Sequence, residues 1–416
     1  MSSGASLKRD LRTGTPVWIA DPPRPAPPTP LEQDVRVDVA LIGCGVSGAL
    51  VADALLQAGR TVAAFDRRGV AQGSTAASTA LLQFELDQPL TLLSRRIGAE
   101  KAVRAYWRSA TAVAHLRGRI ADLNLRCGFR ERHTLYLPGN VLAAAGLREE
   151  AEARARVGLR SRFIDAETLR RLTAAPGTDP LETGIDRPGA IWSGGAGEVD
   201  PVALVRGLWR SATDRGATIH APCDIVDIAP GATQVVLTTD AGRKVRAKHL
   251  VLATGYELSK LVRPKGYKVI STWAFATRPQ PDRLWPSRCL IWEAADPYLY
   301  IRTTRDGRVL VGGEDADFSD EAKRDRQLPA KVKRIAKKLG ALMPGLDTEP
   351  DFTWTGCFGD SATSMPAIGP VPGAPRCFAV LGFGGNGITF SAIAAQVIQR
   401  AILGLPDPDA DLFALA

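Results

Sequence analysis

The chain has 416 residues, of which 45% are hydrophobic and 23% charged, and its formal net charge is +9. This is the composition of an ordinary globular protein, which argues against a disordered chain, and the length is enough for two domains. The positive charge is dispersed along the sequence, which argues against a nucleic-acid-binding protein.

The basic run does not indicate a nucleic-acid-binding patch, and the cysteine and histidine pattern does not indicate a metal site. The densest basic run alternates with apolar residues, which predicts the solvated face of an amphipathic helix; it comprises Lys331, Lys333, Arg334, Lys337 and Lys338. Six scattered cysteines and four distant histidines have no metal-ligand spacing, so we expect no metal site and a reducing compartment. No apolar leader or membrane-length apolar stretch is visible, and the expected location is the cytoplasm, without a transmembrane segment.

Residues 1–35 are predicted to be a tail. Prolines stand at positions 16, 22, 23, 25, 27, 28 and 30, which predicts polyproline or irregular structure. Trp18 is expected to anchor this tail on the body of the protein.

The stretch 37–66 has the pattern of a nucleotide-binding unit. An apolar run from Val37 to Ile42 predicts a buried strand, the turn Gly43-Cys44-Gly45-Val46-Ser47-Gly48 follows, and a helical pattern ends at Gly59. A second strand, 61–65, ends in Asp66. A G-x-G-x-x-G turn with an acid about 20 positions on predicts a dinucleotide site, because the glycines admit a pyrophosphate and the acid accepts from a ribose.

A run of small and hydroxyl residues follows at 71–80, Ala-Gln-Gly-Ser-Thr-Ala-Ala-Ser-Thr-Ala. Small side chains allow close backbone approach and hydroxyls bind phosphates or ring edges, although a plain polar loop is the alternative. The pattern is then helical from Leu90 to Leu125, and another helix is predicted to begin at Asp200-Pro201.

The rest of the chain alternates strands and helices. A short strand at 134–137 lies among charged helices, and strands are expected at 218–220, 225–228, 235–238 and 247–252. The segments 267–277, 290–293, 298–303 and 309–312 predict an antiparallel sheet, and helix 329–339 follows. A second glycine loop, 382–389, leads into an apolar helix at 391–403, which predicts a second place for an anionic or dipolar ligand edge.

Five of these motifs together resemble the FAD-dependent D-amino-acid oxidase superfamily, which includes the glycine, sarcosine and gamma-glutamylputrescine oxidases. They are the fingerprint, the hydroxyl run, Val251-Leu252-Ala253-Thr254-Gly255, Met365-Pro366-Ala367-Ile368-Gly369 and the second glycine loop, in the family's order over 36–405. The segments 298–302 and 306–313 are most similar to the gamma-glutamylputrescine oxidase branch.

The resemblance implies an α/β fold in which a Rossmann-type FAD-binding domain is interleaved with an antiparallel-sheet substrate domain. We expect the FAD-binding domain to comprise 36–128, 191–265 and 355–416, and the substrate domain to comprise 129–190 and 266–354.

The resemblance also implies a set of FAD-binding residues. The pyrophosphate would be held by Gly43, Gly45, Val46, Ser47 and Gly48, the ribose by Asp66, and the adenosine half by Arg67, Arg68 and Ile225. In the hydroxyl run, the residues that would line the pyrophosphate and the ring are Ser74, Thr75, Ser78, Thr79, Ala80 and Leu81. The end of the later strand would pass under the cofactor with Ala253, Thr254 and Gly255. The pyrimidine edge of the flavin would be met by Gly384, Gly385, Asn386, Gly387, Ile388 and Thr389.

The sequence departs from the family where the substrate is expected. Phe358 stands where amino-acid oxidases carry an arginine that binds the substrate carboxylate, and Thr389 stands where sarcosine oxidases carry a lysine. Either the substrate lacks an α-carboxylate, or another group such as Arg302 binds it. Tyr300 and Arg302 are the candidate catalytic residues, with ordinary strand residues as the alternative, and the pocket lining is expected to include Tyr298, Trp354 and Phe358.

We therefore expect an FAD-dependent oxidoreductase that oxidises an amine or amino acid by hydride transfer to flavin. The imine would hydrolyse to an aldehyde or oxo acid, and oxygen or another acceptor would reoxidise the flavin. Cys357 lies one residue out of register with the cysteine that tethers flavin in sarcosine oxidases, so non-covalent FAD is expected. An NAD-dependent dehydrogenase and a flavin subunit of a multi-subunit amine dehydrogenase are the alternatives.

Overall fold

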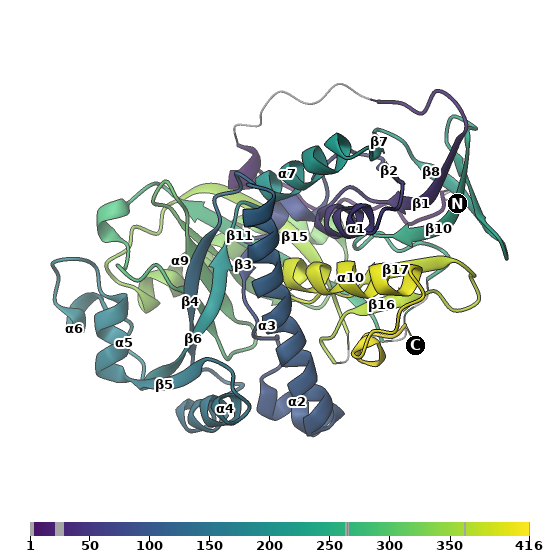
Figure 1. The fold of residues 1–416 in the computed structure, drawn as a ribbon. Coiled ribbons are helices and arrows are strands. Elements are labelled where there is room, and N and C mark those ends of the chain that lie inside the picture. The colour runs from purple at the N-terminus through teal and green to yellow at the C-terminus, as the bar shows by residue number, and fades with distance from the viewer. Residues whose placement is uncertain (1–3, 21–28, 263, 265, 362, 416) are drawn as a thin grey trace.

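The first of two β-sheets contains the predicted nucleotide-binding unit (Figure 1). In this computed structural model, which describes residues 4–20, 29–262, 264, 266–361 and 363–415, the strand order is β16-β17-β10-β1-β2-β7. The strands are β1 (Val35–Ile42), β2 (Val62–Phe65), β7 (Thr218–His220), β10 (Lys244–Leu252), β16 (Ala367–Pro370) and β17 (Cys377–Leu381). All neighbours are parallel except β16 and β17, and β8 (Ile225–Pro230) and β9 (Val235–Thr239) extend β10 as an antiparallel ribbon.

The strands of this sheet are apolar on both sides, as is typical of parallel strands, so other elements must cover the sheet. Helices provide part of this cover. All four residues of β2 are buried. Helices α1 (Val46–Gln57) and α10 (Gly387–Ile402) pack against the sheet, and α7 (Pro201–Asp214) packs on α1, so α1 lies between the other two. Asp200 caps α7, since its carboxylate accepts from the backbone N–H groups of Val202 and Ala203.

The second sheet is largely antiparallel, in the order β15-β11-β14-β13-β12-β4-β6-β3, and β5 pairs with β6. Its strands are β3 (Leu81–Leu82), β4 (Arg130–Leu137), β5 (Ser161–Asp165), β6 (Gly189–Glu198), β11 (Lys268–Thr277), β12 (Leu290–Glu293), β13 (Leu299–Thr303), β14 (Val309–Ala316) and β15 (Pro350–Asp360). Helix α9 (Leu328–Leu342) packs on it, and the two share a buried apolar core. The mixed α/β class expected from the sequence is thus confirmed.

The helical pattern expected from 90 to 125 is confirmed, in the form of two consecutive helices. The chain forms α2 (Leu90–Ile97) and α3 (Ala99–Asp122), because Gly98 between them has φ of 91°, a left-handed conformation that interrupts a helix. The remaining helices are α4 (Ala144–Arg156), α5 (Ala166–Thr173), α6 (Pro180–Thr183) and α8 (Glu321–Arg326). Short 3-10 turns are η1 (Val17–Ile19), η2 (Ser74–Ala77), η3 (Pro281–Arg283) and η4 (Ala410–Leu412).

Two expected domain boundaries disagree with the sheets. The expected FAD-binding domain includes 191–265 and 355–416, but β6 pairs with β4 over 191–198 and β15 pairs with β11 over 350–360, both in the second sheet. The hydrogen-bonded register, which no local pattern encodes, decides their membership. An interleaved two-domain division remains a proposal, with these strands assigned to the second part.

The N-terminal segment 4–20, which we call the strap, is hydrogen-bonded to both sheets. The backbone N–H of Ala5 donates to Ile225 (3.2 Å), that of Thr15 donates to Thr353 (3.0 Å), and the indole N–H of Trp18 donates to the carbonyl of Ser78 (2.8 Å). The prediction that Trp18 anchors the tail is confirmed. The expected polyproline at positions 22, 23, 25, 27 and 28 lies outside the described residues.

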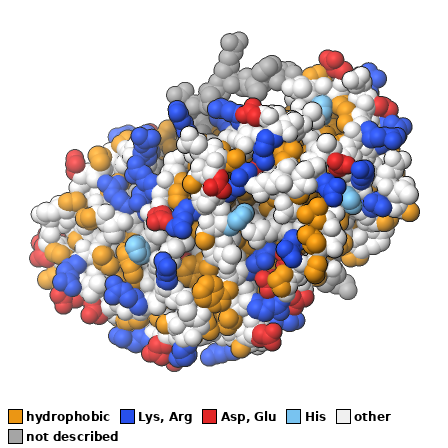
Figure 2. Space-filling view, viewed as in Figure 1, with side chains coloured by type: hydrophobic (Ala, Val, Ile, Leu, Met, Phe, Trp, Pro, Cys, Tyr) orange, Lys and Arg blue, Asp and Glu red, His pale blue; other side chains and the backbone are white. Residues whose placement is uncertain are grey.

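Surface charge is mixed on the face shown in Figure 2, where basic side chains lie among acidic ones over several elements. Among the described residues, no helix has the length and apolar character needed to cross a membrane. Over the same residues, no group of three or more histidine, cysteine or acidic side chains converges as a metal site would require.

Candidate active site

One large pocket lies where the carboxyl ends of β1, β2 and β10 face the second sheet. Its empty space is about 1680 Å³, part of it open to solvent. Of the predicted cofactor-binding residues, the pocket is lined by Gly43, Gly45, Val46, Ser47, Asp66, Arg67, Arg68, Ser74, Thr75, Ser78, Thr79, Ala80, Leu81, Ala253, Thr254, Gly255, Gly384, Gly385, Asn386, Gly387 and Ile388.

The first glycine turn is tight enough to exclude side chains. A Cβ on Gly43, whose φ is 110°, would lie 2.3 Å from the carbonyl oxygen of Ala253 on the neighbouring strand. A Cβ on Gly48 would lie 1.9 Å from the carbonyl oxygen of Gly43. Gly48 therefore does not line the pocket itself but lets α1 begin directly beneath the turn, so that the helix N-terminus faces the pocket.

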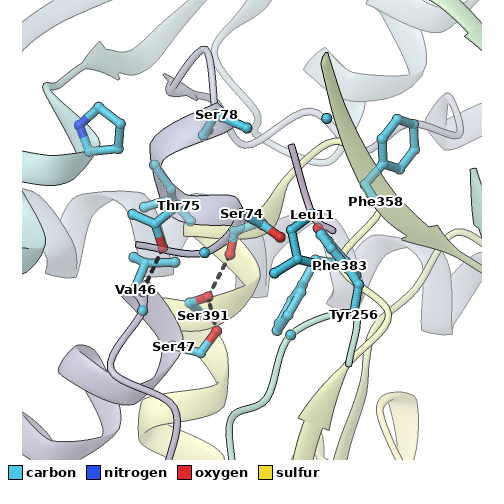
Figure 3. Close-up of a pocket in the computed structure, with 18 of the residues that line it drawn as sticks. Leu11, Val46, Ser47, Ser74, Thr75, Ser78, Tyr256, Phe358, Phe383 and Ser391 are labelled. Carbon is cyan, nitrogen blue, oxygen red and sulfur yellow. Dashed lines mark hydrogen bonds between the residues drawn. The ribbon is translucent and has the colours of Figure 1, made fainter. Parts of the chain in front are cut away.

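The hydroxyl run lies directly against this turn in the pocket wall (Figure 3). The Oγ1 atom of Thr75 accepts from the backbone N–H of Val46 (3.1 Å), and Ser47 and Ser391 share a hydrogen bond of 2.8 Å that ties α1 to α10. The Oγ of Ser74 is buried without a hydrogen-bond partner among the described residues. A buried hydroxyl in a pocket wall without a protein partner suits a polar ligand atom.

Asp66 is held rigidly at the end of β2. Its carboxylate accepts from the backbone N–H of Cys44 (2.7 Å), Arg68 (2.7 Å) and Gly69 (2.8 Å). Each carboxylate oxygen accepts up to two hydrogen bonds, so one further acceptor position remains for a hydroxyl group of a ligand.

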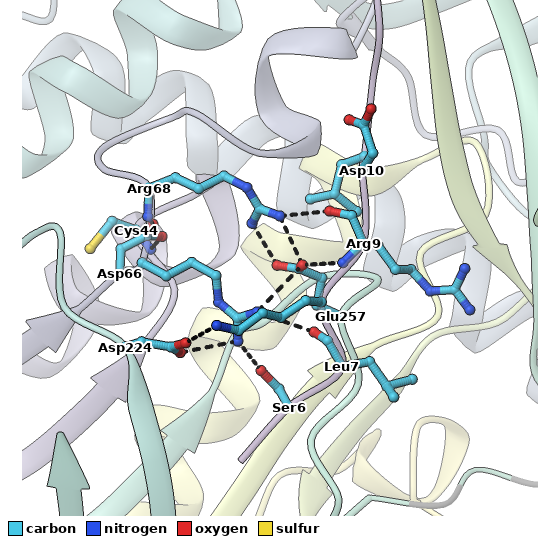
Figure 4. A network of polar contacts seen from close by, with 12 residues as sticks. Ser6, Leu7, Arg9, Asp10, Cys44, Asp66, Arg68, Asp224 and Glu257 are labelled. Carbon is cyan, nitrogen blue, oxygen red and sulfur yellow. Dashed lines mark hydrogen bonds and ion pairs between the residues drawn. The ribbon is translucent and has the colours of Figure 1, made fainter. Parts of the chain in front are cut away.

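Arg67 and Arg68 connect this end of the pocket to the strap (Figure 4). The Arg68 guanidinium donates to both oxygens of Glu257 at 2.6 and 2.8 Å and to the carbonyl of Arg9 at 2.7 Å. The hydrogen bonds to Glu257 raise the pKa of Arg68. Arg67 lies 3.3 Å from Asp224, so both arginines are engaged in ion pairs rather than free on the surface.

Aromatic side chains close the opposite end of the pocket, which we call the aromatic chamber. It is lined by Tyr256, Trp292, Tyr298, Tyr300, Phe358 and Phe383. The Tyr300 hydroxyl lies 3.0 Å from the Oγ1 atom of Thr272. The ring of Tyr300 lies over Gly312, where a Cβ would be 2.2 Å from the ring. Burial raises the pKa of both Tyr298 and Tyr300 well above the ordinary value, so both phenols are neutral near pH 7.

The geometry does not place Arg302 in this chamber. Its guanidinium is 3% exposed and donates to the carbonyls of Thr79, Ala80, Val199 and Thr303 at 2.8–3.2 Å. Alternation along β13 sends Tyr300 and Arg302 to one face of the sheet, but the register brings Arg302 beneath the hydroxyl run. Burial lowers its pKa to about 10, which still leaves it charged. The expected contact between Arg302 and a substrate is therefore not met.

Three other predicted site residues also lie off the main pocket. Trp354 is 1% exposed and donates to the carbonyl of Ala77 (3.0 Å), so it supports the hydroxyl run from behind. Thr389 is buried in α10 and donates to the carbonyl of Gln83 (3.1 Å). Ile225 lines a small side pocket that shares Arg67 and Thr254 with the main one.

Comparison with known proteins adds the family. The family model described as FAD dependent oxidoreductase, abbreviated DAO, matches residues 38–401. The chain belongs to this family of FAD-dependent oxidoreductases. Among its relatives, glycine oxidase of Bacillus licheniformis is 23% identical over 388 residues, covering 89% of this chain and 94% of the relative. Gamma-glutamylputrescine oxidoreductase of Escherichia coli (strain K12) is 24% identical over 391 residues, covering 91% and 86%.

Solved structures agree in fold. Glycine oxidase from Geobacillus kaustophilus superposes with a TM-score of 0.73 at 19% identity, covering 92% of this chain and 99% of that one. L-proline dehydrogenase from P. horikoshii superposes with a TM-score of 0.72 at 15% identity, covering 92% and 97%. At these identities the likeness concerns the fold alone.

The pocket of this DAO-family chain fits FAD by its own geometry. The glycine turn leaves room for a pyrophosphate that a side chain would fill, Asp66 keeps an acceptor position, and Ser74 offers a buried hydroxyl without a partner among the described residues. The pocket continues from there into the aromatic chamber, which is the shape a dinucleotide with a terminal ring system requires.

Several residues that line the pocket were missed by the sequence analysis. Ser6 and Leu11 reach it from the strap, and Figure 3 shows Leu11 on the same side of the pocket as Tyr256 and Phe383. Asp87 and Gln83 reach it from the loop beyond the hydroxyl run. A polar tail and a lone acid in a loop carry no local signal of function, so only the tertiary structure brings them to the site.

Proposed function

We propose that this protein oxidises the carbon–nitrogen bond of a small amine or amino acid with FAD as the resident cofactor. One observation supports the proposal: a single pocket is lined both by a dinucleotide-binding glycine turn and by the aromatic chamber. The names of two relatives, glycine oxidase and gamma-glutamylputrescine oxidoreductase, support an amine nitrogen in the substrate.

When bound, FAD would supply the hydride-accepting chemistry. The protein's own residues would bind, orient and desolvate the amine. Tyr298, Tyr300 and Phe358 would exclude water from the reacting carbon, and Tyr300 would be held in place by its contact with Thr272. The first turn of α10, which starts at Gly387 beyond Asn386, would direct its positive dipole end toward negative charge that develops in the pocket.

The residues that would hold FAD follow from their positions in the pocket. Gly43, Gly45 and the N-terminus of α1 would bind the pyrophosphate, and Asp66 would accept from a ribose hydroxyl. Residues 74–81 would line the pyrophosphate and ring, and 384–388 would meet the pyrimidine edge. Arg302, Trp354 and Thr389 would act only by supporting these segments.

We propose that FAD is held without a covalent bond. Cys357 lines the pocket, and burial raises the pKa of its thiol to about 11, so the thiol is protonated near neutral pH. A protonated thiol is a poor nucleophile, whereas thiolate is the reactive form.

Absorbance and substrate reduction test the proposal directly. Purified protein should absorb near about 450 nm, a typical flavin value, and a substrate from a panel of amines and amino acids should bleach this band under anaerobic conditions. Peroxide formation on readmission of air would identify oxygen as the acceptor, and reaction with a dye alone would indicate another one. A colourless protein that does not take up added FAD contradicts the proposal.

A further inference from the structure

The loop that follows the hydroxyl run places one carboxylate in the aromatic chamber. We propose that Asp87 binds the ammonium group of a cationic amine substrate, and that substrates with an α-carboxylate are selected against. This inference rests on the proposed function and specifies its substrate class.

Asp87 lies against the second glycine loop. Its carboxylate accepts from the backbone N–H of Gly385 (2.8 Å) and from the side-chain amide of Asn386 (3.2 Å). A Cβ on Gly385 would lie 2.8 Å from an oxygen of Asp87 and 3.1 Å from the hydroxyl of Tyr298. The carboxylate and the tyrosine thus meet at the same point of the pocket wall, with the glycine loop between them.

The charge distribution in the pocket separates Asp87 from the other ionised groups. Five charged side chains line the pocket, and four of them, Asp66, Arg67, Arg68 and Glu257, lie around the first glycine turn. Among the described residues that line the aromatic chamber, Asp87 carries the one formal charge. A carboxylate with aromatic faces around it favours a cation and disfavours an anion.

A second buried acid strengthens this negative character. The carboxylate oxygens of Asp315, behind Tyr298 and Tyr300, are buried. Burial raises the pKa of Asp87 to about 6 and that of Asp315 to about 7. The charge of Asp87 also raises the pKa of Asp315, and the charge of Asp360 raises that of Asp87. An ammonium bound beside Asp87 in the pocket would offset this cost of burying negative charge, which is the physical reason to expect a cation there.

Among the described residues that line the chamber, no cationic side chain offsets this preference. Phe358 stands where a carboxylate-binding arginine was expected, and Arg302 donates to backbone carbonyls beneath the hydroxyl run. A substrate carboxylate in the chamber would thus lose its hydration without gaining an arginine partner among the described lining residues.

Three small probes without an α-hydrogen test the inference without turnover. They are tert-butylamine (a cation), tert-butanol (its neutral isostere) and 2-aminoisobutyric acid (the α-carboxylated analogue), each titrated against the FAD-loaded protein by the change in flavin absorbance. A charge-assisted contact predicts that tert-butylamine binds roughly 10- to 150-fold more tightly than tert-butanol, and more tightly than 2-aminoisobutyric acid. This comparison uses the wild-type protein alone.

Variants then assign the effect to Asp87. Asp87→Asn keeps an acceptor for the Gly385 N–H and should remove the preference for tert-butylamine, while the affinity for tert-butanol stays within about twofold. The matched control is Asp360→Asn, which removes a nearby negative charge that does not line the pocket. At about pH 8, where Asp87 is ionised with or without Asp360, this control should leave all three affinities unchanged. Asp87→Glu keeps the charge and should retain the preference for the cation.

Two results would overturn the inference while leaving the proposed function intact. One is a flavin-loaded protein that binds 2-aminoisobutyric acid at least as tightly as tert-butylamine. The other is an Asp87→Asn variant that weakens all three probes equally, which is the result expected if Asp87 only supports the glycine loop. Absence of bound flavin would instead contradict the proposed function itself.

Discussion

Replacement of Arg302 by methionine separates a structural role from a substrate-binding one. The guanidinium is 3% exposed, its N–H groups satisfy four backbone carbonyls, and it lies 3.8 Å from Glu198, which also pairs with Arg132 at 2.8 Å. Removal of one member of a buried charged network costs about 3–5 kcal/mol, because the remaining polar groups stay buried. With a urea dependence of about 3 kcal/mol per molar or more for a chain of this size, the unfolding midpoint should fall by on the order of 1 M.

The assay is equilibrium urea unfolding of the FAD-free protein, followed by tryptophan fluorescence. Arg334→Met is the matched control, because Arg334 is 56% exposed and its pair with Glu314 is at 3.4 Å; it should cost less than about 1 kcal/mol. Arg302→Met should also lose FAD more readily than the wild-type protein, because Arg302 holds the carbonyls of Thr79 and Ala80 in the pocket wall. An unchanged midpoint together with a lost preference for α-carboxylated substrates would show that Arg302 faces the substrate and refute the reasoning.

Three further predictions concern the cofactor and the substrate. Gly48→Ala should abolish FAD binding, measured by absorbance after dialysis, because its Cβ would lie 1.9 Å from a backbone oxygen; Gly118→Ala, where a Cβ meets nothing within 4 Å, should bind FAD normally. Acid precipitation should release all yellow colour into the supernatant, whereas a yellow pellet would mean that Cys357 or another residue is bonded to the flavin. The KM for an amine should rise as pH falls through about 6, because protonation of Asp87 removes its charge, and Asp87→Asn should have a flat KM over that range.

The sign of the pH effect follows from the groups that face Asp87. The carboxyl of Asp87 is negative above its pKa of about 6, while an alkylamine remains a cation up to about pH 10, so attraction is present between these limits and lost below the lower one. Tyr136, Tyr256 and Tyr298 also face Asp87, but burial raises the pKa of each, so they stay neutral. Asp315 titrates near 7 and Asp360 adds negative charge, so both broaden the transition without reversing it.

The sequence by itself determined the parts of this protein that depend on short-range pattern. The strand, the G-x-G-x-x-G turn and the following helix are specified by apolar periodicity and by positions where no Cβ fits, and these features are local in the chain. They were enough to predict a dinucleotide site, and together with four further motifs in the family's order they predicted the FAD-dependent family and the α/β class, both confirmed. The role of Trp18 as an anchor of the N-terminal tail was also predicted and is confirmed.

Only the tertiary structure decided which side chains share the pocket. Arg302 and Tyr300 are two residues apart on one strand, yet strand pairing buries the first under backbone carbonyls and leaves the second in the aromatic chamber. Asp87 reaches Gly385 across almost three hundred positions of the chain, and Leu11 reaches Cys357 across a similar span (|i−j| of 298 and 346). Such contacts depend on sheet register and loop path, which long-range packing selects, so no periodicity or short motif in the sequence encodes them.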